Sequence, residues 1–538
     1  MPSKDLIVLL SLYMKRFTTF AQQLSHVYCP MKRLLHRFST LCLSIQLFSI
    51  VAAVTHGKSA LAQISQQLPE HWPNIPLISI HTVNGEMPTC ERAQTPEGCV
   101  GTTITNNNYV PGRMVMTLRG DTLYDSKDYV ADLSGMRLKI RGNSSGAFLD
   151  QKPYKLKLSK KADLLCRGRK AFRNKNWALM SYYIYNPSMP NHETNLIPLF
   201  AHALARYVGM PWQPEGRFVN VVINDQYRGI YLLLETVDKG DSRINVAEDG
   251  FIIENDPCWW NEDGKYFHTN HQMAHLGYTY NKYMPGDGER PAAVDSVRDY
   301  MNRVEDAIWN KEDLSEYIDF YTFTRWIISH DLLAVGDAIG SNTYLYCESM
   351  NSDGEHSKLR MGPIWDLDSS YNIPFNIWGL KHTYYSAYYP QTEFYYPKLF
   401  EIPQFVEAYK EAYAQIRPHI VDQMQHFCDS ITELYSQTLE ESAALHRTIY
   451  PNEAQNTIPE QTADLMDKFR RRIAAVDSLI AADMPSTGIS ATTITRPHSH
   501  SRFDLTGRNV STIPFTQLPA GVYIETSSDG TTRKVMKR

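Results

Sequence analysis

The pattern of apolar and polar positions predicts a strand-rich first half of the chain. Five short segments are strand-like, and in two of them, 136–141 and 155–158, apolar residues alternate with polar ones, a period of two that is typical of β-strands. The segments are 77–83, 112–118, 136–141, 155–158 and 252–254. Two further apolar runs, 218–223 and 229–235, flank the dipeptide Asn224-Asp225, which favours a tight turn. We therefore expect these two runs to form a β-hairpin.

Helical periodicity replaces the alternation in the second half. It covers 195–208, 294–334 and 399–482. A stretch rich in Ser, Thr, His and Pro at 485–501 interrupts the helical pattern and is typical of a linker. Alternation returns at 502–538. Strands first and helices later predict an α+β fold, with a helical extension at 391–484 and a small β-rich tail.

The first 62 residues have the features of a targeting segment. Basic residues follow Met31, an apolar run covers 41–54, and Ala60-Leu-Ala62 supplies the small residues of a cleavage site. The run is short for a membrane helix, which needs about 20 apolar residues. We expect a secretory signal, with Met31 as an alternative start, and no transmembrane span after its cleavage. An uncleaved anchor is the alternative.

The composition is that of a large globular protein. The 538 residues are 43% hydrophobic and 21% charged, which suffices for two or three domains. The formal net charge of −4 argues against nucleic-acid binding through bulk charge. The cysteines after the signal include no C-x-x-C pair, which disfavours a zinc ribbon. Cys90 and Cys99 flank a short loop and are candidates for a disulfide in an exported protein.

The segment 337–368 carries the residue types that phosphoryl transfer needs. Asn342 lies five positions after Asp337, and a later W-D-L-D sequence adds Asp366 and Asp368. In kinases one Asp faces the attacking hydroxyl, an Asn of the same loop helps to hold a metal, and a later Asp binds the metal on the nucleotide phosphates. Such short motifs also occur as turns and helix caps, so the interpretation needs support from the rest of the chain.

Five sequence blocks resemble the spore coat protein H (CotH) kinase family. In order, they are R-G-N-S-S at 141–145, K-P-Y-K-L-K-L at 152–158, N-W-A-L at 176–179, Y-R-G-I-Y-L-L-L-E at 227–235 and G-P-I-W-D-L-D at 362–368. The resemblance covers residues 75–390 and implies an atypical protein-kinase-like core there. It implies the use of ATP with Mg²⁺ or Mn²⁺ to phosphorylate Ser or Thr hydroxyls of a protein substrate or of the chain itself.

The resemblance implies a strand lysine that contacts the phosphates. Lys152 takes this role, with Lys155 and Lys157 as alternatives, because a compact ammonium suits non-bridging phosphate oxygens. Glu235 closes an apolar strand, where an unpaired carboxylate is costly. We expect it to orient the lysine or hold a metal, and a surface-facing strand end is the alternative.

A small-residue turn is the second part of the implied phosphate site. Arg141, Asn143 and Ser144 belong to this turn, where backbone N–H groups can approach an anion. An ordinary turn between strands is the alternative interpretation.

The resemblance also implies roles for the four polar residues of the 337–368 segment. Asp337 matches the catalytic-loop Asp that accepts or orients the substrate hydroxyl. Asn342 and Asp366 match metal-holding residues, and Asp368 is either a second ligand or a turn-stabilising carboxylate. Mg²⁺ needs only one or two carboxylates besides phosphate oxygens and water, so few protein ligands suffice.

The sequence departs from the family pattern at two places. Val335 stands where members usually have an Asn, two residues before the catalytic-loop Asp, and residues 185–195 replace an expected charged segment. These departures favour an alternative function, a catalytically inactive kinase-like adhesion or scaffold protein. A metal-dependent hydrolase is a third hypothesis, and the lack of a nearby His cluster counts against it.

The tail at 502–538 resembles the C-terminal sorting domain of type IX secretion. F-D-L-T-G-R-N-V at 503–510 and L-P-A-G-V-Y-I at 518–524 carry this resemblance. It implies export from a Gram-negative cell through the secretion machinery, and hence a secreted or surface protein. A small structural β-module is the alternative.

Overall fold

The computed structural model describes most of the chain after the N-terminal segment. The described residues are 68–69, 71–105, 108–182, 195–272, 275–286, 293–335, 342–371, 396–453, 455–483, 501–504, 521–526 and 532–537. They fall into two compact units that divide after Ala481. The signal segment, Asp337 and most of 185–195 lie outside the described residues.

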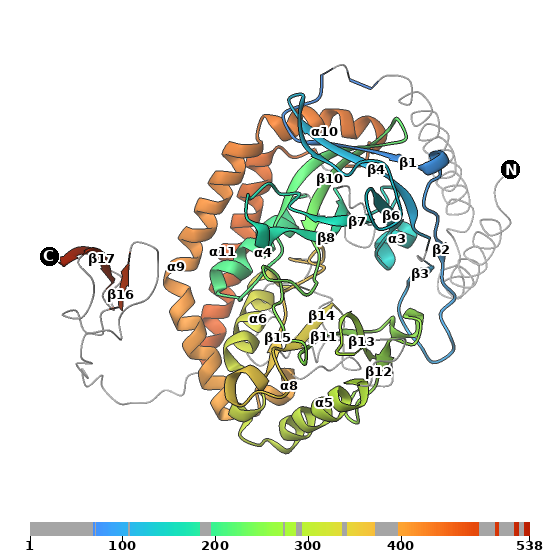
Figure 1. Ribbon diagram of the computed structural model, residues 1–538. Coiled ribbons are helices and arrows are strands. Elements are labelled where there is room, and N and C mark those ends of the chain that lie inside the picture. Colours follow the sequence, from blue (N-terminus) through green and yellow to red (C-terminus); the bar gives the residue numbers. More distant parts are fainter. Residues whose placement is uncertain are drawn as a thin grey trace, which may run out of the picture. The chain divides into compact units, whose positions relative to one another are not determined.

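A closed β-barrel forms the first part of the larger unit (Figure 1). Strand β1 pairs in parallel with β9 and antiparallel with β4, and this double pairing closes the sheet. In spatial order the barrel strands are β1 (Leu77–Thr82), β9 (Gly216–Ile223), β10 (Gln226–Glu235), β8 (Asn174–Ser181), β7 (Tyr154–Ala162), β6 (Met136–Ile140) and β4 (Val110–Leu118), and β5 (Asp121–Asp125) extends the sheet beyond β4. Closure removes the exposed edges that an open sheet would have. The alternating segments predicted the strands but not the closure.

The predicted hairpin is confirmed as β9 and β10. Asn224 and Asp225 both have positive φ, 50° and 60°, which suits the right-handed twist of the two strands. A bulge follows at Tyr227–Gly229, where Gly229 has φ 97°. A Cβ there would lie 2.5 Å from Nδ1 of His446, so glycine is required for the approach of that helix.

An antiparallel five-stranded sheet follows the barrel in the chain. Its spatial order is β12 (Tyr266–Phe267), β13 (Gly277–Tyr283), β11 (Phe251–Asp256), β14 (Thr343–Cys347) and β15 (Leu359–Met361). Strands β14 and β15 lie inside the 337–368 segment, and the polar sequence between them forms a turn at the surface. The aromatic sequence T-Y-L-Y-C is buried throughout, which explains why this part is strand rather than loop.

Helices pack on the sheets and complete the larger unit. The longer ones are α4 (Ile197–Val208), α5 (Ala293–Asn310), α6 (Phe320–Leu333), α9 (Pro403–Tyr435), α10 (Thr438–Ile449) and α11 (Ile458–Asp483), and the short ones are α3 (Ser144–Phe148) and α8 (Tyr396–Leu399). The pattern at 294–334 therefore forms two helices. Helix α9 packs on α4 and α6, and one hydrophobic core includes residues of all the longer helices. The mixed content of helix and strand confirms the α+β prediction at this level.

The short pairs and the tail complete the described structure. Strands β2 (Glu91–Arg92) and β3 (Ile104–Thr105) form a separate ladder. In the second unit, β16 (Ser501–Asp504), β17 (Gly521–Thr526) and β18 (Thr532–Lys537) form an antiparallel sheet. Among the helices that the structure describes, none has the length and apolar character needed to cross a membrane.

The proposed disulfide is not formed. Cys90 and Cys99 are both free thiols. The thiol of Cys90 instead lies 3.8 Å from the carbonyl oxygen of Gly146. The prediction from loop spacing was wrong because spacing along the chain does not fix the direction of the two side chains.

Candidate functional site

Cationic side chains lie on the outer face of the barrel. Lys139 of β6 and Lys155 of β7 are direct neighbours across the ladder. Their chain neighbours Leu138 and Leu156 point into the barrel core, so the alternation of the strands turns both ammonium groups outward. Arg141 follows Lys139 at the next outward position. The result is a group of three cations on one face.

Charged residues of the five-stranded sheet interact with these cations. Glu254 of β11 lies opposite Tyr344 of β14 in register, and the Tyr344 hydroxyl donates to its carboxylate. Lys282 of β13 lies 5.5 Å from the centre of the Tyr344 ring and interacts electrostatically with both Glu254 and Lys155. We call the following residues the intersheet site: Lys139, Arg141, Lys155, Glu254, Lys282, Asn342, Tyr344 and Asp366.

Burial and neighbouring charges change the pKa values of these groups. Burial, reinforced by repulsion from Lys282 and Lys139, lowers the pKa of Lys155 to about 7. Burial raises the pKa of the Glu254 carboxyl, and Lys282 and Tyr344 act in the opposite direction. Burial and repulsion by Glu254 raise the pKa of nearby Asp256 to about 8. A ligand of opposite charge would stabilise the ionised form of each of these groups.

The predicted metal-holding residues Asn342 and Asp366 are brought together. The Asn342 side chain hydrogen-bonds to the Asp366 carboxylate. Asp366 remains accessible to water, yet the surrounding protein removes enough hydration to raise its pKa against the effects of Arg141 and Asn342. The Arg141 guanidinium lies 5.5 Å from the centre of the Trp365 ring. This pair and the cations of the barrel therefore belong to one charged site.

Both residues also have an unusual backbone conformation. Asn342 has φ 55° and Asp366 has φ 57°. Asn and Asp adopt this left-handed region more readily than other non-glycine residues, and such conformations concentrate at functional sites. They turn two short polar side chains from separate segments toward each other.

The predicted phosphate lysine and turn have other contacts. The Lys152 ammonium donates to the carbonyl oxygen of Gly146 at 2.9 Å, which ties the turn to β7. Asn143 accepts a hydrogen bond of 2.9 Å from the Thr103 hydroxyl. Ser144 is exposed at the start of α3. Of the lysines considered from sequence, the alternative Lys155 is the one that lies in the intersheet site.

Glu235 lies on the opposite side of the barrel wall from Lys155. It pairs in register with Trp177, a residue of the barrel core, whereas Lys155 pairs with Ala178. Its buried carboxylate accepts from Arg167 at 2.7 Å and lies 3.8 Å from Arg243. Glu235 therefore does not orient the lysine; it neutralises two arginines at the end of the barrel.

Asp337 and Asp368 are the remaining residues that the sequence predicted for the site. Asp337 lies outside the described residues, so its role stays a prediction. Asp368 is half-buried, two residues beyond Asp366. Across the described ranges, no group of three or more His, Cys, Asp or Glu side chains is arranged to hold a metal. A metal at Asn342 and Asp366 would thus need oxygens from a ligand or water as well.

Sequence reasoning missed Lys139, Glu254, Lys282 and Tyr344. Lys139 alternates with apolar residues in β6, which is also the pattern of an ordinary solvent-facing lysine. Glu254 was visible as an acid within the apolar sequence F-I-I-E-N-D. An acid in a buried strand needs a partner, and this was the one available signal.

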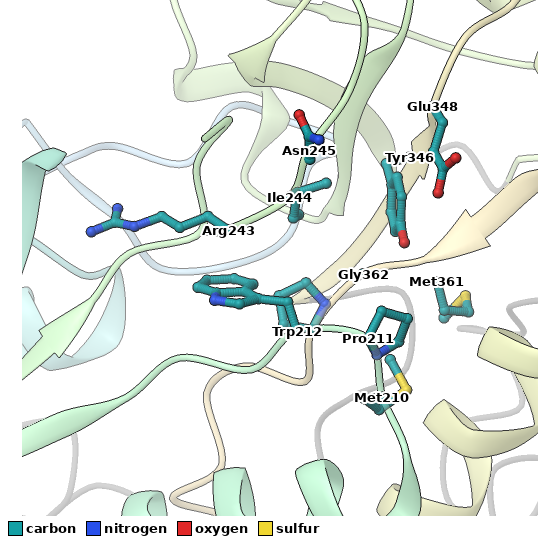
Figure 2. A pocket seen from close by; sticks show the side chains of 11 residues that line it. Met210, Pro211, Trp212, Arg243, Ile244, Asn245, Tyr346, Glu348, Met361 and Gly362 are labelled. Carbon is teal, nitrogen blue, oxygen red and sulfur yellow. The ribbon is translucent and has the colours of Figure 1, made fainter. Parts of the chain in front are cut away.

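The larger unit contains a cavity of about 150 Å³ (Figure 2). It is lined by Met210, Pro211, Trp212, Arg243, Ile244, Asn245, Tyr346, Glu348, Met361, Gly362 and Pro363. Arg243 donates to the carbonyl oxygen of Asn176 at 3.0 Å, and the Asn176 amide donates to Asp238 at 2.7 Å. Asp238 interacts in turn with Lys155. The cavity is therefore connected to the cationic group by a short chain of contacts.

Comparison with protein families identifies a relationship that covers most of the two sheets. A family model described as CotH kinase protein matches residues 138–472, more than half of the chain. The match includes part of β6, the barrel strands β7 to β10, the whole five-stranded sheet and most of α11. No curated protein matches the chain.

Proposed function

Because the chain belongs to the CotH kinase protein family, we propose that it transfers the γ-phosphoryl group of ATP to a protein hydroxyl, with Mg²⁺ or Mn²⁺. The acceptor is a Ser or Thr of a protein substrate or of the chain itself. One observation carries the proposal: the Asn342–Asp366 pair lies in the same charged site as Arg141, Lys155 and Lys282. Phosphoryl transfer relies on positioning and on neutralising phosphate charge, and this site offers both.

The donor set fits a hard divalent cation. Asn342 and Asp366 supply a carbonyl and a carboxylate oxygen, and Asp368 is the nearest further carboxylate in sequence. Asn342 and Asp366 would hold the metal ion, which would supply positive charge to neutralise the phosphates. Two protein oxygens suit Mg²⁺, which keeps several water and phosphate ligands.

The cations fit a triphosphate. Lys155 takes the role that the resemblance implied for a strand lysine, and Arg141 and Lys282 are close enough to interact with it electrostatically. Burial lowers the pKa of Lys155, and repulsion from Lys282, Lys139 and Arg141 lowers it further; a polyanion bound between these cations would relieve the repulsion. Asp337 would accept or orient the substrate hydroxyl, as the family motif implies.

The cavity suits a planar base. The Trp212 and Tyr346 side chains and the Met210 and Met361 thioethers provide apolar and polarisable surface, and Asn245 provides an amide (Figure 2). The strand end at Met361 leads within five residues to Asp366. A nucleotide with its base here would direct its phosphates toward the intersheet site.

Export of the protein is part of the proposal. The signal-like N-terminal 62 residues and the tail at 502–538 that resembles a type IX sorting domain both support a secreted or surface location. The tail would engage the export machinery of a Gram-negative cell.

The alternative function is an inactive kinase-like scaffold. Val335 is fully buried, so the position where the family usually has an Asn is part of the hydrophobic core and offers no polar group to a substrate. In this case the intersheet site would bind nucleotide without turnover, or bind none.

Calorimetry and autophosphorylation of the full chain test the proposal. We expect wild type to bind ATP only with Mg²⁺ or Mn²⁺ and to incorporate labelled phosphate. Asp366→Asn and Lys155→Met should abolish incorporation, whereas Lys160→Met, an exposed lysine of the same strand, should behave as wild type. Lys152→Met separates the two lysine assignments, and we expect it to retain incorporation. Metal-dependent binding without incorporation would support a nucleotide-binding scaffold, and no binding at all would refute the kinase.

A further inference from the structure

The C-terminal end of helix α6 is held by residues far away in the sequence. The last carbonyl groups of a helix have no partner within it and must be satisfied from elsewhere. Arg472 of α11 donates from Nε to the carbonyl oxygen of Asp331. The Asp331 carboxylate accepts a hydrogen bond of 2.5 Å from the hydroxyl of Tyr409 on α9. All three side chains are buried, so water does not compete for these bonds.

The same helix end holds the turn that begins at Asp366. The Tyr371 backbone N–H donates to the carbonyl oxygen of Leu333 at 2.8 Å. The Ser370 N–H and hydroxyl both donate to the Leu367 carbonyl, at 3.1 and 2.7 Å. Tyr371 has φ 60°, a conformation that a bulky residue keeps only where its surroundings hold it.

Aromatic packing connects the turn to α11 by a second route. The Tyr371 ring lies edge-on to Phe200 of α4, with centroids 6.4 Å apart. Phe200 lies edge-on to Phe469 of α11 at 5.9 Å. Phe469 precedes Arg472 by three positions, so both side chains lie on the same face of α11.

We propose that Arg472 is a positioning residue for the metal-holding turn, a role that rests on the function proposed above. By capping α6, it fixes the Leu333 carbonyl that anchors Tyr371, and thereby the turn that starts with Asp366. A cation is favoured at the C-terminal end of a helix, and a guanidinium presents several donors in a fixed plane. A lysine has a single donor group without that plane, so it does not reproduce the contact.

Hydrogen exchange of the full chain tests this role without nucleotide, metal or activity. We compare wild type, Arg472→Lys and the control Arg470→Lys, whose exposed guanidinium contacts Gln425. The amides of 366–371 should exchange about tenfold faster in Arg472→Lys, which is the effect of losing one buried charge-assisted hydrogen bond. Amides of β8 should be unchanged, and Arg470→Lys should match wild type.

Two outcomes overturn the proposal. If the amides of 366–371 exchange at the same rate in Arg472→Lys as in wild type, the turn does not depend on Arg472. A uniform increase across the larger unit would show a general structural role instead. If Arg472→Lys does not fold, Tyr409→Phe removes one hydroxyl from the same network, and faster exchange confined to 366–371 would again support the proposal. Because no step requires catalysis, the result stands whether or not phosphoryl transfer is found.

Discussion

Replacing Glu235 by alanine distinguishes a structural carboxylate from a catalytic one. The carboxylate is fully buried and lies 2.7 Å from Arg167 and 3.8 Å from Arg243. It also accepts a hydrogen bond of 3.2 Å from the backbone N–H of Glu215. Removal of one partner from a buried ion pair leaves uncompensated charge and costs about 3–5 kcal/mol. We expect Glu235→Ala to lose that amount of unfolding free energy.

Urea denaturation followed by circular dichroism measures this loss. Glu215→Ala is the matched control, because Glu215 pairs with the same Arg167 at 3.0 Å but has a side chain 46% exposed. An exposed pair of this kind contributes at most about 1 kcal/mol. Under conditions where Glu235→Ala remains folded, its affinity for ATP with Mg²⁺ should equal that of wild type, since Glu235 and Lys155 lie on opposite faces of the barrel wall. A loss no larger than that of Glu215→Ala, or a loss of nucleotide binding by folded protein, would refute this reasoning.

Three further predictions concern the barrel and its surroundings. Gly229→Ala places a Cβ 2.5 Å from His446 Nδ1. It should destabilise the fold by about 2 kcal/mol more than the control Gly120→Ala, because Gly120 has a similar φ of 88° but open space around it. Equal unfolding midpoints of the two variants would contradict this prediction. Burial raises the pKa of Glu453 to about 8, so the unfolded chain releases this proton at lower pH than the folded protein, and stability should fall as pH rises from about 4.5 to 8. The urea midpoint should fall less steeply with pH in Glu453→Gln than in wild type. An unchanged slope would show that Glu453 is not the group responsible. The pKa of Lys155 is lowered to about 7, so at pH 8 binding of a polyanion should take up a proton, measured by calorimetry in buffers of different ionisation enthalpy and absent in Lys155→Met.

The alternating pattern determined the strands and the directions of their side chains. The sequences M-R-L-K-I and Y-K-L-K-L placed Leu138 and Leu156 on one face and Lys139 and Lys155 on the other, as the structure has them. The Asn224-Asp225 turn was equally local, because two residues that tolerate positive φ suffice to specify a tight hairpin. The family motif also brought together Asn342 and Asp366, which are separated by a hairpin in the sequence.

Only the tertiary structure decided what each face meets. Period-two alternation separates two faces of a strand but does not say which one lines a barrel interior and which one faces a second sheet. That distinction arises from the pairing of β1 with β4 and with β9. Strands β1 and β9 are separated by more than 100 residues in the sequence. The fold placed Lys155 among charged partners and put Glu235 with arginines at the barrel end. Lys282 and Glu254 joined the site for the same reason: electrostatic neighbours depend on distance in space, and the chain alone fixes only distance in sequence.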